Sequence, residues 1–145
     1  MPTVAELPLP LLLLDTSVAV PWLVEDHESH VAVVEALHSR VLGLAGHAAF
    51  ETFSVLTRLP GDQRVSPAVA AALLARGFPE TRHLSSERST ALLDSFSRLR
   101  VSGGSVYDAL VAAAAVEHGL TLVSRDARAL ATYDAVGAEV RYLDG

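Results

Sequence analysis

The sequence predicts an α/β domain built around a parallel β-sheet, and three observations predict this class. Short apolar runs recur between longer segments of helical periodicity, which is the pattern of repeated β–α units. The first run, Leu11–Leu14, is wholly apolar, as expected of a strand that is buried on both faces. The length of 145 residues fits one domain, residues 1–145, in which residues 1–10 form a leader.

Four elements are expected between the first strand and residue 60. Asp15 and the two hydroxyl residues after it are suited to cap a short helix, and Pro60-Gly61 is suited to close a longer one. Between them, valine and leucine residues recur at helical spacing and lead into a short apolar run. The expected elements are a helix that ends at residue 24, a helix over residues 29–41, a strand over 42–45 and a helix over 47–59.

The second half of the chain carries clearer helix ends. Ser66 and Pro67 have the order of a helix cap and its first turn. Ser105 follows a Gly-Gly break and is placed to cap a helix that Gly119 ends. The expected elements are helices over residues 67–76, 86–99, 106–118 and 126–136, with strands over 81–84, 120–123 and 139–143.

The composition excludes several classes of protein. There is no cysteine, so disulfides, thiolate zinc sites and cysteine nucleophiles are excluded. All eleven cationic side chains are arginine, so a phosphate-binding loop and a Schiff-base enzyme, which need a lysine, are excluded too. The apolar run after the leader is far shorter than the ~20 residues needed to cross a bilayer. We therefore expect a cytoplasmic protein that has no membrane partner.

The net charge of −6 does not decide whether the protein binds nucleic acid. Nucleic-acid-binding domains usually carry a basic face. A metal-dependent nuclease, however, needs a cluster of carboxylates that itself adds to the acidity. An acidic protein also suits a basic protein partner.

Four acidic residues stand where a parallel sheet would bring them together. Asp15 directly follows the first predicted strand, and Asp126 follows the strand over residues 120–123. Asp108 lies in the first turn of one helix and Glu51 lies within another. In open parallel sheets, ligands bind beyond the carboxyl ends of the strands. We therefore expect these carboxylates at one rim of the sheet.

Each acid also has a structural interpretation, as a helix cap or a solvated side chain, but their surroundings favour function. Glu51 is flanked by Phe50, Phe53 and Leu56, which are expected to face the core, and Asp108 begins an alanine-rich helix. A carboxylate against apolar surface is costly unless it is paired or bound to a cation. All-oxygen ligands select hard cations, so Mg²⁺, or Mn²⁺, is the expected metal. Such an ion activates water for phosphodiester hydrolysis.

Three stretches around these acids form a recognisable set. They are DTSVAV after an apolar strand, Glu51 with Arg58-Leu59 on a helix, and YDALVAAAAVEHGLTLVSRD. In the last stretch an acid, an alanine-rich helix, a glycine, an apolar strand and Ser-Arg-Asp follow in order. Together these stretches, over about residues 11–143, resemble the PIN-domain family and in particular its VapC-like toxins. The resemblance implies a three-layer α/β/α fold, usually as a homodimer.

The resemblance also implies a function. Members of this kind are Mg²⁺-dependent endoribonucleases that cleave structured RNA such as tRNA or rRNA. They are the toxins of type II toxin–antitoxin systems, and a VapB-like antitoxin inhibits them. Carried over position by position, the catalytic and metal-binding residues would be Asp15, Glu51, Asp108 and Asp126, with Thr16 or Ser17 and Ser124 as supporting residues. Arg125 and Arg128 adjoin this predicted metal site, so they are the favoured candidates among the arginines for phosphate contacts.

Two features leave details of this site open. The three supporting hydroxyl groups are equally suited to cap neighbouring helices. After the last acid this family often has an aromatic residue, whereas Ala127 and Arg128 stand here. Whether Asp126 ligates a metal directly is therefore not decided by the sequence.

Other interpretations have specific weaknesses. A phosphatase of the haloacid dehalogenase type needs a second acid where Ser17 stands, and it needs a lysine. A zinc site at His27 and His30 lacks further ligands at a matching distance, and Trp22 suits the core better than a partner groove. His47 is spaced to pair with Glu51.

The remaining alternative is a PIN-like domain that binds RNA or protein without catalysis. A metal titration would distinguish the two, because a domain that only binds need not hold a metal at the acids.

Overall fold

The computed structural model describes residues 10–144, so the predicted leader lies outside the described residues except for Pro10. Its sheet has four parallel strands in the order β2-β1-β3-β4. The prediction that the first apolar run and the run near residue 121 are adjacent parallel strands is confirmed, because Leu13 pairs with Leu122. The strands are β1 (Leu11–Leu14), β2 (Val41–Leu44), β3 (Thr121–Ser124) and β4 (Val140–Tyr142).

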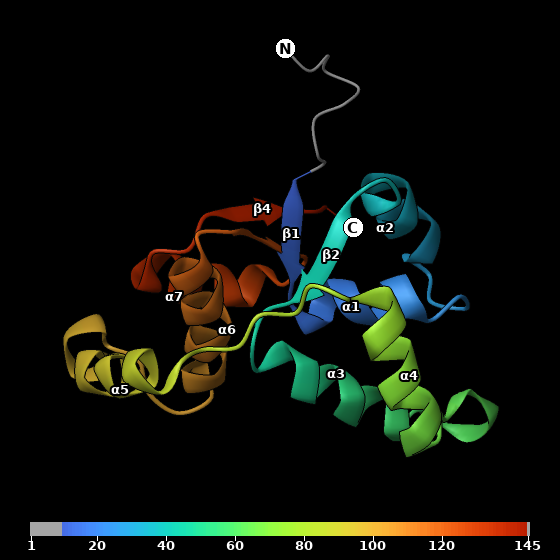
Figure 1. The fold of residues 1–145 in the computed structure, drawn as a ribbon, viewed down its shortest axis with the longest axis horizontal. Helices are drawn as coiled ribbons and strands as arrows, with labels where there is room; N and C mark the ends of the chain where they lie inside the picture. The colour runs from blue at the N-terminus through green and yellow to red at the C-terminus, as the bar shows by residue number, and fades with distance from the viewer. Residues whose placement is uncertain (1–9, 145) are drawn as a thin grey trace, which may run out of the picture.

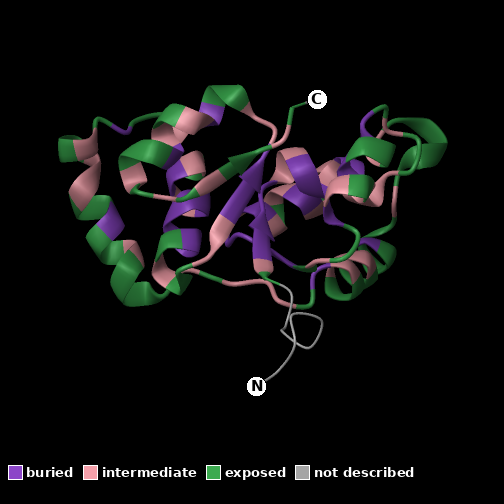
Figure 2. Cartoon of the chain, turned by 90° about the horizontal axis from the view of Figure 1, so that it is seen from above, coloured by how far each residue is buried: buried purple, intermediate pink, exposed green. Residues whose placement is uncertain are grey.

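Helices cover both faces of the sheet, which confirms the three-layer α/β/α fold (Figure 1). α1 and α2 pack on one face and α6 and α7 on the other, and the buried strands lie between the two groups (Figure 2). Within residues 10–144, no helix has the length and apolar character needed to cross a membrane. The α-helices are α1 (Thr16–Leu23), α2 (His30–Leu37), α3 (Ala48–Thr57), α4 (Pro67–Gly77), α5 (Ser86–Leu99), α6 (Ser105–His118) and α7 (Leu130–Val136).

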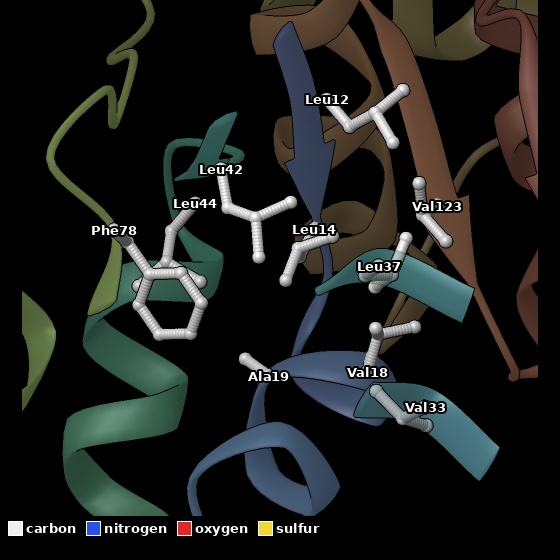
Figure 3. Packing of buried hydrophobic residues seen from close by; sticks show 10 residues of the cluster. All are labelled: Leu12, Leu14, Val18, Ala19, Val33, Leu37, Leu42, Leu44, Phe78 and Val123. Atoms are coloured by element: carbon white, nitrogen blue, oxygen red, sulfur yellow. The ribbon is translucent and has the colours of Figure 1, made fainter. Parts of the chain in front are cut away.

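The central strand β1 supplies both halves of the core. Leu12 and Leu14 point into a cluster with residues of α1 and α2 (Figure 3), and Trp22 packs partly buried against it. Leu13 points the opposite way, into a cluster with α6 and α7. Side chains alternate across a strand, so a strand covered on both faces needs apolar residues at every position. Each buried leucine stabilises the fold by about 1.5–3 kcal/mol relative to an exposed one.

Gly46, two residues before α3, lies close to α6. Gly46 has a φ of +52°, and a Cβ atom at this residue would lie 3.0 Å from the Cβ of Ala114. Glycine adopts this conformation without strain and leaves room for α6. The first turns of α3 and α6 carry Glu51 and Asp108, respectively.

Two sequence predictions about local structure are wrong. The segment 81–84 makes only an isolated parallel bridge, between Ala45 and Arg82, instead of a strand. Its ladder stops because the Thr81 hydroxyl, not a backbone carbonyl, accepts from the Leu44 N–H at 3.0 Å. Ser105 does not cap α6 either, because its hydroxyl donates to the Ser102 carbonyl, and the N-cap is the residue before it.

Two predicted helices have different bounds in the structure. The helix expected over residues 29–41 ends at Leu37, because Val41 belongs to β2. The helix expected over residues 126–136 begins as a 3-10 turn, η3 (Ala127–Ala129), before α7. A short 3-10 turn, η2 (Gly61–Gln63), follows α3.

The prediction that Phe50 faces the core is also wrong. Its side chain is exposed, and Phe53 is only partly buried. The buried residues of α3 are Ala48, Thr52 and Leu56, which are four residues apart and share one face of the helix. Phe50 lies two residues from this set and therefore points away from it.

Candidate functional site

Asp15 is a buried carboxylate at the carboxyl end of the central strand. It is 4% exposed and sits at the N-cap position of α1, but its side chain makes no capping hydrogen bond. Instead, its Oδ1 accepts from the Ser17 hydroxyl, and its Oδ2 accepts from the Tyr133 hydroxyl at 2.8 Å. The helix-cap interpretation of Asp15 is thus not what the structure shows. The carboxylate is held in one orientation by residues of α1 and α7.

Burial raises the pKa of Asp15 above its ordinary value of 3.8. The hydroxyls of Ser124, Ser17 and Tyr133 oppose this by stabilising the charged form, and the nearby charge of Asp126 adds to the rise. Burial of the Tyr133 phenol, together with the charge of Asp15, raises the pKa of Tyr133 far above its usual range. Tyr133 therefore keeps its proton and remains a hydrogen-bond donor to Asp15.

The other three predicted acids lie around Asp15. Glu51 comes from the first turn of α3, Asp108 from the first turn of α6, and Asp126 from the residue before η3. All four line one cavity of about 70 Å³, which we call the acid cavity. The structure thus brings together carboxylates from four separate elements at the carboxyl ends of β1 and β3.

Like charges in the acid cavity affect one another. Partial burial is the main cause that raises the pKa of Glu51 above 4.5, and the charges of Asp108 and Asp15 raise it further. His47 opposes the rise, with its Nε2 atom 4.0 Å from Glu51 Oε1. The spacing prediction for this pair is therefore confirmed. Acids that repel one another in this way favour a bound cation.

Arg128 places a cation at the mouth of the acid cavity. Its guanidinium contacts Asp108 at 3.2 Å and Asp126 at 3.0 Å. The two carboxylates raise the pKa of Arg128 above its ordinary value. Asp126 also accepts from the Arg128 backbone N–H at 3.1 Å, so it caps η3 as well as lining the cavity. Both interpretations that the sequence left open for Asp126 are thus compatible with its position.

The predicted supporting hydroxyls connect the elements around the acids. Ser17 donates to Asp15 and accepts from the Arg125 backbone N–H at 2.8 Å, so it links α1 to the end of β3. Thr16 donates to the Ala48 carbonyl at 3.4 Å and thereby contacts the start of α3. The buried Ser124 hydroxyl accepts from the Asp126 N–H at 3.0 Å.

Arg125 lies differently from the expected support for a phosphate. Its guanidinium donates to the Ser29 hydroxyl at 2.7 Å and thus anchors the start of α2. The arginine that lines the acid cavity is Arg128. Arg125 directly follows β3, whereas Arg128 lies within η3.

Nothing in the sequence around Tyr133 singles it out as part of the site. It lies 118 residues from Asp15, and its place on a helix gives it the appearance of an ordinary core position. The sequence offers one indication, which is that the residue is a tyrosine, since a buried tyrosine needs a hydrogen-bond partner for its hydroxyl. A buried acid elsewhere in the chain is the natural partner for that donor.

The chemistry of the donor set fits a hard divalent cation. The acid cavity offers carboxylate and hydroxyl oxygens, which are the ligands Mg²⁺ and Mn²⁺ prefer. Within residues 10–144, no three acidic or histidine side chains come close enough to enclose a metal ion. Instead, the guanidinium of Arg128 bridges two of the acids.

The chain matches a known protein family. The model of the PIN domain matches residues 12–135, most of the chain. The protein belongs to the PIN-domain family. Within this family it is a member of the VapC-like toxins, as its similarity to curated members shows.

Two relatives come from Mycobacterium tuberculosis. The chain is 49% identical over 131 residues to Ribonuclease VapC27 of strain ATCC 25618 / H37Rv, over 90% of this chain and 96% of the relative. It is 41% identical over 128 residues to Ribonuclease VapC40 of strain CDC 1551 / Oshkosh, over 87% of this chain and 94% of the relative.

Two solved structures share the fold. VapBC2 from Rickettsia felis, bound to a DNA fragment from the promoter, has a TM-score of 0.65 at 14% identity, covering 92% of this chain and 99% of the other. FitAcB from Neisseria gonorrhoeae has a TM-score of 0.63 at 20% identity, covering 89% and 95%. At these identities the likeness concerns the architecture.

The raised pKa of Asp15 predicts how stability without metal depends on pH. The folded protein holds this proton more tightly than the unfolded chain does. The carboxyl group therefore contributes stability that is present below about pH 3.8 and is lost as the pH rises through the folded-state pKa. Asp15→Asn removes this loss, so in EDTA the variant should become more stable relative to the native protein as the pH rises.

Urea unfolding at about pH 4 and about pH 7 measures this difference. Asp94→Asn, which removes an exposed carboxylate on α5, is the matched control and should show a much smaller change between the two pH values. If the Asp15 variant loses more stability at neutral pH than at acid pH, the carboxylate charge stabilises the fold and the interpretation is wrong.

Proposed function

We propose that this protein is a Mg²⁺-dependent endoribonuclease, with Mn²⁺ as an alternative metal, and the toxin of a type II toxin–antitoxin system. The observation that carries the proposal is the convergence of Asp15, Glu51, Asp108 and Asp126 on one cavity. The names of the relatives, Ribonuclease VapC27 and Ribonuclease VapC40, support the reaction. Structured RNA such as tRNA or rRNA is the proposed substrate class, because the resemblance to VapC-like toxins implies it.

The residues of the acid cavity divide the work. Asp15, Asp108, Asp126 and Glu51 would hold the metal, which supplies a water of lowered pKa and offsets charge on the phosphodiester. Ser17 and Tyr133 orient Asp15, so the carboxylate at the base of the cavity stays in place while its neighbours adjust.

Metal binding requires a rearrangement at the mouth of the cavity. The acids must move toward one another, and Arg128 must leave the position it takes between Asp108 and Asp126. The side chain of Arg128 is 70% exposed, so its displacement costs little. Once displaced, its guanidinium is available to phosphate oxygens of the RNA, which arginine binds with matched geometry.

The alternative is a PIN domain that binds RNA or protein without catalysis. Such a domain has no need to hold one acid in a fixed, desolvated position by two donors, as Asp15 is held. The position where a haloacid dehalogenase carries its second acid is Ser17, which donates to Asp15. Catalysis by the acid cavity is therefore the better-supported function.

We further propose a VapB-like antitoxin as the partner and a homodimer as the assembly. The name of VapBC2 of Rickettsia felis, which shares the fold, joins VapB with VapC and supports such a partner. A small basic protein would suit the net charge of −6. The contacts of Arg128 show that the acid cavity accommodates a guanidinium, so an arginine of the partner would fit there in place of a metal.

Cleavage of RNA by graded variants tests the reaction. With unfractionated tRNA and rRNA as probes, Asp15→Asn should abolish Mg²⁺-dependent cleavage while the fold persists. Tyr133→Phe, which removes only a donor that orients Asp15, should lose roughly 10- to 100-fold. Asp94→Asn on the exposed face of α5 should cleave like the native protein. Full activity of the Asp15 variant, or of the native protein in excess EDTA, would exclude the metal-nuclease mechanism.

Co-expression tests the partner. The product of the adjacent small reading frame should bind this protein, suppress cleavage in vitro and restore growth of cells that express the toxin. An Asp108→Asn variant, which removes one carboxylate that pairs with Arg128, should bind this partner more weakly. Growth inhibition that the neighbouring product leaves unchanged would contradict the assignment of the partner.

A further inference from the structure

Three exposed rings and one partly buried ring lie side by side next to the acid cavity and outside the core. Phe50 is 66% exposed and Tyr107 is 52% exposed. The ring of His47 stacks on Tyr107, with centroids 5.1 Å apart and planes 22° apart. The Phe50 centroid lies 6.4 Å from that of His47 and 6.2 Å from that of His83. We call these four residues the aromatic row.

The aromatic row adjoins the acid cavity. Phe50 directly precedes Glu51 and Tyr107 directly precedes Asp108, so two rings flank two of the acids. A hollow of about 310 Å³ is lined by His47 and Phe50 together with Thr16, Glu51 and Arg58. Thr16 and Glu51 also line the acid cavity. A chain whose phosphate lies at the acids would therefore pass over this hollow and the rings beside it.

We propose that the aromatic row binds unpaired bases of a single-stranded RNA segment beside the phosphodiester that is cleaved. This inference rests on the proposed ribonuclease function. Single-stranded RNA is recognised through unstacked bases that lie on aromatic side chains, and every base offers a π-face. Arg58, exposed at the edge of the hollow, provides positive charge for the RNA backbone.

The geometry favours a base over an apolar side chain as the occupant. Phe50 also borders an apolar hollow between α3 and α4, together with Phe53 and Leu74, where an apolar peptide would be the natural ligand. The stacked pair of His47 and Tyr107 lies next to the acids, since the Nε2 atom of His47 is 4.0 Å from Glu51 Oε1. Flat rings with polar edges beside a phosphate site match the shape and polarity of a nucleobase.

Binding of a fluorescent RNA tests the row. The probe is a single-stranded oligonucleotide of about eight nucleotides that carries 2-aminopurine, whose fluorescence falls when it stacks. The full-length protein is used with Mg²⁺ in the Asp15→Asn background, where the probe should stay intact. Phe50→Leu and Tyr107→Leu keep apolar volume but remove the π-face, so each should weaken Kd roughly ten-fold and restore fluorescence.

Matched variants separate stacking from general surface effects. Tyr107→Phe keeps the ring and should bind the RNA like its parent. Leu93→Ala, which removes a 67% exposed leucine on α5, should leave Kd unchanged. Unchanged Kd and fluorescence in both leucine variants of the row would overturn the proposal. It would also be overturned if these variants lose only the antitoxin and keep RNA affinity, because the row would then be a protein-docking surface.

The failure of this inference is distinguishable from that of the proposed function. If the native protein cleaves RNA with Mg²⁺ and the row variants bind RNA normally, only the stacking proposal fails. If the Asp15→Asn background cuts the probe, the mechanism proposed for the acid cavity fails, and the loss of intact probe on a gel shows this directly.

Discussion

The charge of one buried carboxylate constrains the site. Asp15 stands at the end of the strand that supplies both halves of the core, and burial there is unfavourable for its charged form. Its two oxygens are matched by donors from two helices, Ser17 of α1 and Tyr133 of α7. Because these helices cover opposite faces of the sheet, the carboxylate joins the two outer layers at the rim.

The other three acids add negative charge beside Asp15, where burial already disfavours a charged carboxylate. Glu51 and Asp108 lie in the first turns of α3 and α6, and Asp126 caps η3 after β3. Such a group is stable only with a cation beside it. In this structure Arg128 provides that cation. Its exposure makes it a replaceable counterion, which is what a metal, a substrate or an inhibitory protein would require.

Much of this arrangement is predictable from sequence because it follows from short-range pattern. Strands buried on both faces leave apolar runs, which is why β1 and β3 and their pairing are predicted correctly. Acids that follow such strands share a rim by topology alone. The prediction of a strand over residues 81–84 is wrong because the Leu44 N–H donates to the Thr81 hydroxyl instead of to a backbone carbonyl. The prediction that Phe50 faces the core is wrong because α3 is short and has apolar residues on several sides, so its sequence does not show which face is buried.

The parts that escaped prediction depend on tertiary contacts. Nothing near Tyr133 in the chain indicates that its hydroxyl meets Asp15, since the pair spans 118 residues. The sequence likewise does not show which of the two neighbouring arginines contacts the acids, because this depends on tertiary contacts. Arg125 donates to Ser29, whereas Arg128, within η3, pairs with Asp108 and Asp126. Sequence therefore located the acids, while the structure identified the donors and the counterion that hold them.

The central claim is that the acid cavity is a cation site for which Arg128 is the resident counterion. Mn²⁺ binding followed by electron paramagnetic resonance tests this most directly, with no substrate present. The native protein should bind Mn²⁺, Asp15→Asn should bind it much more weakly, and Arg128→Gln should bind it somewhat more tightly, because exposed ion pairs compete only weakly. Equal Mn²⁺ affinity in the native protein and Asp15→Asn, or no Mn²⁺ binding in either, would contradict the claim.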